Sequence, residues 1–194
     1  MYISTFYREI LGLKDDKLIG ELVPVTEIQH YFRKGERLIM TDRKPVYVMF
    51  LLKGIVRGFF MDAKGTDYTD CFVKDCGAAA MPPAQNSKGL PCENMEAATD
   101  CDVLCFPMSR VPRLLKTYPE ALLVYSRLLQ ESLQRHWDLK MMRYCRTAGE
   151  RYAWFRKAYA ELDGQVKLKH IASFLDMKPA TLSRLRRDQN EKGQ

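Results

Sequence analysis

Hydroxyl and guanidinium side chains gather on the outer face of a predicted helix near the end of the chain, where Thr181, Ser183 and Arg184 lie. A guanidinium can donate two parallel hydrogen bonds to O6 and N7 of guanine, and hydroxyl groups can contact other base edges. Four further basic residues are placed to meet phosphates, which position a protein on DNA without reading its sequence: Lys169, Lys178, Arg186 and Arg187. The chemistry predicted from these residue types is recognition of duplex DNA.

Two short helices around a tight turn would present these side chains. Apolar positions recur every three or four residues, as on one helical face: Leu168, Ile171, Ala172 and Leu175 in the first helix, then Leu182 and Leu185 in the second. Asp176 stands at the reversal, where the left-handed conformation is needed, and aspartate tolerates it better than most residues. Pro179 suits the first turn of the second helix. This pattern predicts a helix-turn-helix.

The charge distribution supports the same interpretation. From Lys140 to Gln194 the chain has 13 Lys and Arg against 6 Asp and Glu, whereas Met1 to Leu139 has 18 of each kind. The whole net charge of +7 therefore lies in the last part of the chain. A neutral body with a basic end indicates a polyanionic partner, and such binding weakens as salt is added.

The six cysteines are interpreted as buried free thiols, which behave as small apolar side chains: Cys71, Cys76, Cys92, Cys101, Cys105 and Cys145. None forms a Cys-x-x-Cys pair, which argues against structural zinc. An iron–sulfur cluster needs about four thiolates held together. Because five of the six lie between residues 71 and 105, a cluster or a redox switch stays open as the alternative.

The three histidines argue against an enzyme. His30, His136 and His170 fall in three different predicted elements, so they cannot form one metal or catalytic site of the kind that jelly-roll enzymes need. No apolar run approaches the ~20 residues that span a bilayer. The first residues lack the basic and apolar regions of a signal peptide, so we expect a cytoplasmic protein without a membrane partner.

The first two thirds of the chain change from a helical to a strand pattern. Residues 2–23 are predicted to be helical in two pieces, separated around Gly12 and Asp15. Short β runs punctuated by glycine then follow, a pattern typical of a β-barrel or jelly roll: Glu27–Phe32, Arg37–Met40, Val46–Leu52, Ile55–Met61, Thr66–Val73 and Val103–Phe106.

Residues 74–95 show no clear strand and are predicted to form a long connection that lines the pocket of the barrel. The candidate pocket residues are Phe60, Phe72, Met81 and Asn94. The alternative is that these side chains belong simply to the core.

A long helix is predicted from Glu120 to Cys145, with an apolar residue at every third or fourth position. Its stripe consists of Leu122, Tyr125, Leu129, Leu133, Trp137 and Met141. At ~1.5 Å per residue the helix is nearly 40 Å long, more than one barrel can cover. We therefore expect a two-helix dimer seam, and the alternative is a helix lying along its own barrel.

A further helix is expected at residues 148–162. Thr147 would cap it, with Glu150 completing a capping box. Its aromatic residues would pack against the helix-turn-helix: Tyr152, Phe155 and Tyr159.

The order of barrel, long helix and helix-turn-helix resembles the Crp/Fnr family of bacterial transcription regulators. The residues that carry this resemblance are Phe32-Arg33-Lys34-Gly35-Glu36, Leu51-Leu52-Lys53-Gly54-Ile55-Val56-Arg57-Gly58, Asp62-Ala63-Lys64-Gly65 and Thr181-Leu182-Ser183-Arg184. The family implies a homodimer with an effector in each barrel and two DNA-binding modules one helical turn apart. RNA polymerase is a further partner that such a regulator implies.

The expected fold class is α+β. It comprises an N-terminal antiparallel jelly-roll barrel with flanking helices at 1–118, a dimerisation helix at 119–146, and a helix-turn-helix domain at 147–194. Because few residues follow Arg187, we expect this last domain to lack a full β wing.

Three departures from the family pattern restrict which effectors and which operator sequences we expect. Members that bind cyclic AMP use a Gly-Glu pair and a later arginine, whereas no arginine occurs here between Arg57 and Arg110. Members with an iron–sulfur cluster carry N-terminal cysteines, and the first cysteine here is Cys71. Pro179 and Ala180 stand where many members place an Arg-Glu pair that reads bases.

We therefore expect an unidentified small-molecule effector, no cyclic nucleotide, and neither a metal nor an iron–sulfur cluster. The operator would differ from the familiar one. The alternative function is a small-molecule-binding module whose DNA-binding function is degenerate.

Overall fold

The computed structural model describes residues 2–74, 76–78, 87–162 and 164–192. The chain divides into two compact units. Unit 1 consists of Met1–Gly58 and Phe72–Leu133, and unit 2 consists of Phe59–Cys71 and Gln134–Gln194.

Unit 1 begins with short helices: α1 at Ile3–Thr5, the π-helical turn η1 at Phe6–Ile10, α2 at Asp16–Leu22 and the 3-10 turn η2 at Val23–Val25. The predicted separation of two helical pieces is confirmed. Gly12 adopts φ +69°, and the Asp15 carboxylate caps α2 by accepting hydrogen bonds from the backbone N–H groups of Lys17 and Leu18. Such a cap satisfies N–H groups that have no partner within the helix.

Seven strands follow: β1 Glu27–Phe32, β2 Arg37–Ile39, β3 Tyr47–Lys53, β4 Val56–Met61, β5 Asp67–Val73, β6 Asn94–Ala97 and β7 Cys101–Pro107. They form one sheet in the order β1-β7-β3 and a second in the order β2-β6-β4-β5. In the first sheet β7 pairs antiparallel with both neighbours, with Leu104 opposite Ile28 on one side and Phe50 on the other.

The predicted α+β class with antiparallel strands is confirmed, but neither sheet closes into a barrel in the part of the chain that the structure describes. The alternation of apolar and polar residues predicts that strands exist. Closure depends instead on pairing and stagger between strands far apart in sequence, which a local pattern does not contain. The jelly-roll topology and the missing wing stay predictions.

Strand β6 was not expected, because it falls at the end of the predicted 74–95 connection and is only four residues long. Its position between β2 and β4 is fixed by pairing across the chain rather than by its own sequence.

Unit 1 ends with the 3-10 turn η3 at Met108–Arg110, helix α3 at Val111–Thr117 and the first part of α4, which runs from Pro119 to Cys145. The predicted long helix, Glu120 to Cys145, is therefore confirmed to within one residue. Most of its predicted stripe is exposed, whereas Tyr125 is half-buried. The exposed members are Leu122, Leu129, Leu133, Trp137 and Met141.

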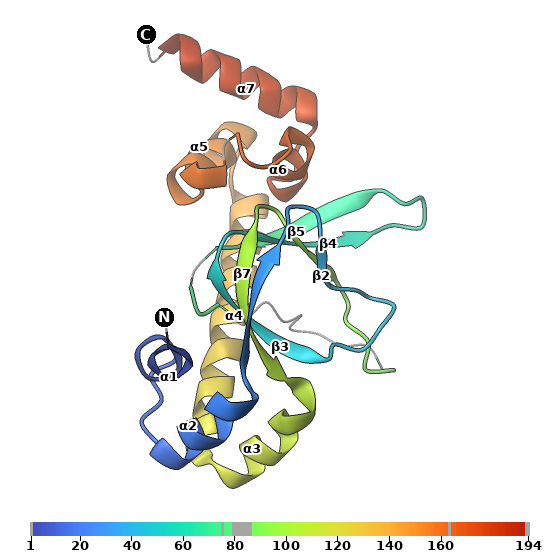
Figure 1. Cartoon of the computed structure of the whole chain (residues 1–194). Coiled ribbons are helices and arrows are strands. Elements are labelled where there is room, and N and C mark those ends of the chain that lie inside the picture. Colours follow the sequence, from blue (N-terminus) through green and yellow to red (C-terminus); the bar gives the residue numbers. More distant parts are fainter. Residues whose placement is uncertain (1, 75, 79–86, 163, 193–194) are drawn as a thin grey trace. The chain divides into compact units, whose positions relative to one another are not determined.

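Unit 2 contains the rest of α4, then α5 at Ala148–Ala158, the 3-10 turn η4 at Ala160–Leu162, α6 at Leu168–Phe174 and α7 at Pro179–Lys192 (Figure 1, orange to red). The predicted capping box is confirmed. Thr147 Oγ1 accepts from the N–H of Glu150, and the Glu150 carboxylate accepts from the N–H of Thr147 at 2.8 Å. Helix α5 ends at Ala158 rather than 162, and a 3-10 turn follows it.

An aromatic cluster joins α5 to α6, as the sequence predicts. The ring of Phe174 lies 6.1 Å from that of Phe155 and 5.5 Å from that of Tyr159, both edge-on. Edge-to-face contacts at these distances are favourable beyond the burial of their area.

Candidate nucleic-acid interface

The two predicted helices and their turn are confirmed in α6 and α7. Ile171, Ala172, Leu175 and Leu182 are almost completely buried between them and their neighbours. Asp176 has a φ of +50°, so the left-handed turn predicted at this residue is present. The N–H of Met177 reaches back to the carbonyl of Ala172 at 3.0 Å, which closes the first helix.

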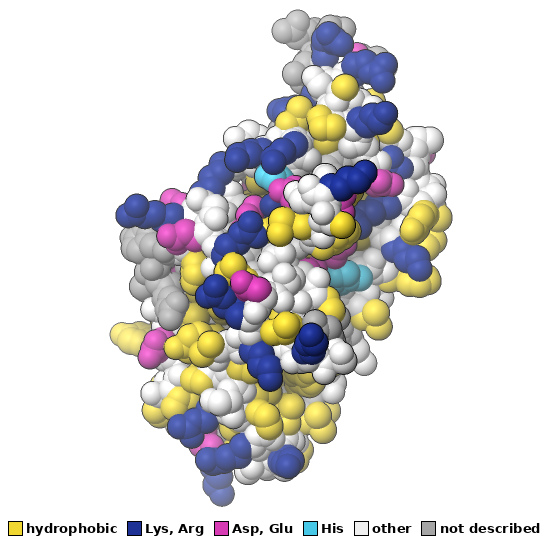
Figure 2. Space-filling model, turned by 90° about the vertical axis from the view of Figure 1, so that its right-hand side faces the viewer, with side chains coloured by type: hydrophobic (Ala, Val, Ile, Leu, Met, Phe, Trp, Pro, Cys, Tyr) yellow, Lys and Arg dark blue, Asp and Glu magenta, His cyan; other side chains and the backbone are white. Residues whose placement is uncertain are grey.

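The outer face of α7 carries the predicted recognition residues. Ser183, Arg184 and Arg187 are exposed, and Thr181 and Arg186 are half-buried. Figure 2 shows Lys and Arg side chains, in dark blue, over this helical segment at its upper end. Such a basic helical face is the electrostatic requirement for binding phosphates.

Lys169 and Lys178 are also exposed and line one open groove together with Pro179. The groove is also lined by residues 65–68, which are the end of the turn between β4 and β5 and the start of β5. The structure thus brings two predicted phosphate-binding residues together at the start of α7.

The part of the β4–β5 hairpin that belongs to unit 2, residues 59–71, contacts α6 in a way that the sequence did not suggest. Asp67 lies 4.0 Å from Lys169 Nζ and 3.6 Å from His170 Nδ1. The N–H of Thr69 donates to Ser173 Oγ at 2.9 Å. An acidic side chain therefore already faces one of the basic residues predicted to bind phosphate.

Arg143, near the end of α4, forms hydrogen bonds with both the hairpin and α6. Its guanidinium donates to the carbonyl of Asp70 at 2.6 Å and to the carbonyl of Phe174 at 3.1 Å. It also pairs with the Asp70 carboxylate at 3.3 Å. The role of Arg143 has no local signal in the sequence, since its partners lie 31 and 73 positions away.

Asp70 is held in its charged form. A hydrogen bond with His136, 3.1 Å away, and then the Arg143 charge lower the pKa of Asp70 below its ordinary value of 3.8, against the opposing effect of burial. A carboxyl group whose pKa is lower in the folded state stabilises the fold above its ordinary pKa, and that contribution is lost as the pH falls through the folded-state pKa.

We therefore expect the stability of unit 2 against unfolding to depend less on acid pH in the Asp70→Asn variant. The urea midpoint of the unaltered protein should fall between pH 5 and pH 3 more than that of the variant, as followed by the fluorescence of Trp154 and Trp137. An equal fall in both proteins would contradict the role given to Asp70.

The four predicted pocket residues are not gathered into one described site. Phe60 is exposed in unit 2, where its ring stacks on that of Tyr68 at 5.4 Å. Phe72 and Asn94 are buried in unit 1, and Asn94 Oδ1 accepts from the N–H of Thr41 at 3.2 Å. Met81 lies outside the described residues, so the pocket stays a prediction.

The cysteines are all free thiols. Cys71, Cys101 and Cys105 are buried, as expected, whereas Cys76, Cys92 and Cys145 are exposed. Burial raises the pKa of Cys105 to about 11, so this thiol stays protonated at neutral pH and is a poor nucleophile.

No helix in the described part of the chain is long and apolar enough to cross a membrane. The long helix α4 is no exception, because charged residues recur along its length.

Comparison with known proteins gives matches among solved structures only. No family model and no curated protein matches the sequence. The structure of FixK2 from Bradyrhizobium japonicum is 19% identical, covers 87% of this chain and 86% of its own, and has a TM-score of 0.73. A protein described as a transcriptional regulator of the Crp/Fnr family from Eubacterium rectale is 15% identical, with a TM-score of 0.75 over 96% of this chain and 88% of its own.

A mutant of CooA from Carboxydothermus hydrogenoformans is 17% identical and covers 95% of this chain and 84% of its own, with a TM-score of 0.66. At such identities the likeness concerns the fold, and it extends over both units rather than over one of them. The chain has a Crp/Fnr-like fold.

Proposed function

We propose that this chain is a DNA-binding transcription regulator of the Crp/Fnr type and not an enzyme. The observation that carries the proposal is the exposed basic face of α7, which is the second helix of a complete helix-turn-helix. Arg184 and Arg187 on this face are exposed to solvent. Such a second helix can enter a major groove with its first turns against the bases. A regulator of this kind would act in the cytoplasm.

The proposed division of labour follows the sequence. Arg184 reads a guanine, Thr181 and Ser183 contact neighbouring base edges, and the remaining basic residues bind phosphates. Lys169, Lys178, Arg186 and Arg187 form that second group. The proposed domain limits are 1–118 for the sensor, 119–146 for the dimerisation helix and 147–194 for the DNA-binding domain.

The proposed assembly is a homodimer through α4. Its exposed stripe, Leu122, Leu129, Leu133 and Trp137, supports this because contiguous apolar side chains of this size on one helical face mark an interaction surface. A two-fold dimer places two recognition helices one helical turn of DNA apart. A small-molecule effector, other than a cyclic nucleotide, and RNA polymerase complete the proposal.

Arg184 is the residue that tests sequence recognition. Arg184→Ala should reduce the preference for the selected operator over random duplex by ~1–3 kcal/mol, because a guanidinium that donates two bonds to guanine is lost. Arg184→Lys keeps the charge but not the paired donors, so it should lose discrimination while retaining affinity for random DNA.

Lys178→Ala is the matched control. It removes a proposed phosphate contact, so all duplexes should bind more weakly by a similar factor and the dependence of affinity on salt should decrease. Fluorescence anisotropy with labelled duplexes at several salt concentrations measures both effects. Unaltered discrimination in both Arg184 variants would defeat the assignment of that residue.

A further inference from the structure

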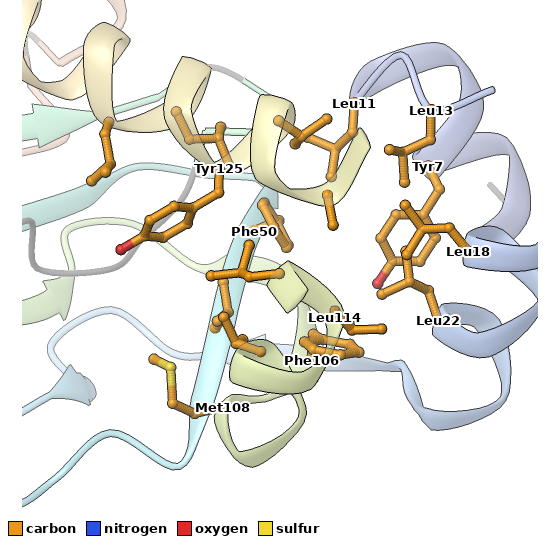
Figure 3. Close-up of a pocket in the computed structure, with 17 residues that line it drawn as sticks. Tyr7, Leu11, Leu13, Leu18, Leu22, Phe50, Phe106, Met108, Leu114 and Tyr125 are labelled. Atoms are coloured by element: carbon orange, nitrogen blue, oxygen red, sulfur yellow. The ribbon is translucent and has the colours of Figure 1, made fainter. Parts of the chain in front are cut away.

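Unit 1 contains an apolar cavity that lies outside the predicted pocket of the sheets. Its volume is about 350 Å³. Helices α2, α3 and α4 and strands β3 and β7 each contribute to its wall, as Figure 3 shows. Representative lining residues are Leu18, Phe50, Phe106, Leu114, Val124 and Leu128. A cavity of this volume falls in the range of small-molecule sites in proteins.

The chemistry of the wall selects an uncharged occupant. None of the described residues that line the cavity carries a charged side chain. The hydroxyl of Tyr7 is hydrogen-bonded to Thr26 at 2.7 Å, and burial raises its pKa to about 12, so it stays neutral. Tyr125 extends from α4 at the other end of the cavity (Figure 3). A charged ligand would lose its hydration here without gaining a counterion.

Polar contacts at the rim fix the distance between the walls on the side of α4. The carboxylate of Glu120 accepts from the N–H groups of Lys14 and Asp15 at 2.8 and 2.7 Å. Arg127 donates to the carbonyl of Leu11 at 2.6 Å. These bonds join the segment between η1 and α2 to α4.

A second set of contacts fixes the side of α3. Glu21, on α2, accepts from Arg113 at 2.7 Å and from the hydroxyl of Tyr118 at 2.7 Å. The surrounding elements are thus held by directional bonds at their margins. The space between them is lined by apolar side chains, which offer water few hydrogen-bond partners, so an apolar occupant would meet little competition from water.

We propose that this cavity is a binding site for an uncharged, apolar small molecule, aliphatic or aromatic. The occupant would contact α4 through Ala121, Val124 and Leu128, and at one edge through Leu129, which also belongs to the exposed stripe. Occupancy would therefore stiffen the first half of the proposed dimerisation helix. Only this last consequence rests on the proposed function, since binding itself requires neither DNA nor a second copy.

The test uses N-phenyl-1-naphthylamine, an uncharged probe that fluoresces in apolar surroundings. The purified full chain should bind it saturably, and 1-octanol should displace it. The matched probe is 8-anilinonaphthalene-1-sulfonate, which has the same rings and a sulfonate. It should bind at least 10-fold more weakly, because none of the described residues that line the cavity carries a cationic side chain.

Two variants on α4 locate the binding. Ala121→Phe places a ring in the cavity and should weaken binding of the uncharged probe at least 10-fold. Leu123→Phe makes a similar change on the same helix at an exposed position that does not line the cavity, and it should leave affinity unchanged. Ala121→Leu, a smaller change, serves if the phenylalanine variant fails to fold, as judged by circular dichroism.

No saturable binding of the uncharged probe, equal affinity for the two probes, or equal affinity in the Ala121 and Leu123 variants would overturn the proposal. DNA binding is measured on the same samples. Probe binding by a protein that binds no DNA would contradict the proposed function alone, and DNA binding without probe binding would contradict this inference alone.

Discussion

Replacing Leu133 by aspartate should convert the proposed dimer into a monomer and lower its affinity for a two-fold operator roughly 100-fold or more. Leu133 lies on α4 with 71% of its surface exposed, in line with Leu129 and Trp137. In a two-helix seam this side chain is buried against its partner, and a carboxylate at that position would be buried without a counterion. Sedimentation velocity and anisotropy with a palindromic duplex measure the two effects.

The matched control is Leu123→Asp. Leu123 is a leucine of the same helix with nearly the same exposure, 69%, but it lies roughly a quarter of a turn away from the centre of the stripe. It should leave the assembly and the DNA affinity close to those of the unaltered protein. A Leu133→Asp protein that still sediments as a dimer at micromolar concentration would show that α4 does not form the seam.

The second large effect is expected from Gly54→Ala, which should destabilise unit 1 by about 4 kcal/mol. Gly54 connects β3 to β4 with a φ of +96°, and a Cβ added there would lie 2.3 Å from the carbonyl oxygen of Asp100 and 2.7 Å from Cys101 Sγ. The new methyl group thus meets backbone that cannot move without disturbing β7. Unfolding in urea, followed by circular dichroism, gives the free energy.

Gly35 separates the two causes of this cost. It has a similar φ of +92°, but a Cβ there would meet nothing within 4 Å. Gly35→Ala therefore carries only the backbone strain, about 1 kcal/mol. An equal loss of unfolding free energy in the two variants would mean that the contact with Asp100 adds nothing to the cost of the backbone strain.

Local features of the fold were predictable from sequence. The helix at Pro119–Cys145, the capping box of Thr147 and Glu150, and the left-handed turn at Asp176 all depend on residues within a few positions of one another. Propensity, capping and turn chemistry act at that range. The arrangement of strands did not follow, because pairing between β6 and β4 joins segments with no common local signal.

The candidate site likewise has features that local sequence predicts and features that it does not. The buried and exposed faces of α6 and α7 agree with the apolar periodicity, so the predicted recognition face is indeed exposed. The contact of Asp67 with Lys169 and the role of Arg143 were missed, since each joins segments dozens of residues apart. The cavity of unit 1 was missed because its lining residues, such as Leu18 and Leu114, are indistinguishable from core residues in sequence.

Binding of genomic DNA tests the central proposal most directly. Fragments of the source genome are selected by the purified chain at physiological salt, and the enriched sequences are then footprinted. The proposal predicts a saturable site with two related half-sites about 34 Å apart, protected together and lost as salt rises. Failure to enrich any sequence, with the same weak affinity for every duplex, would contradict it.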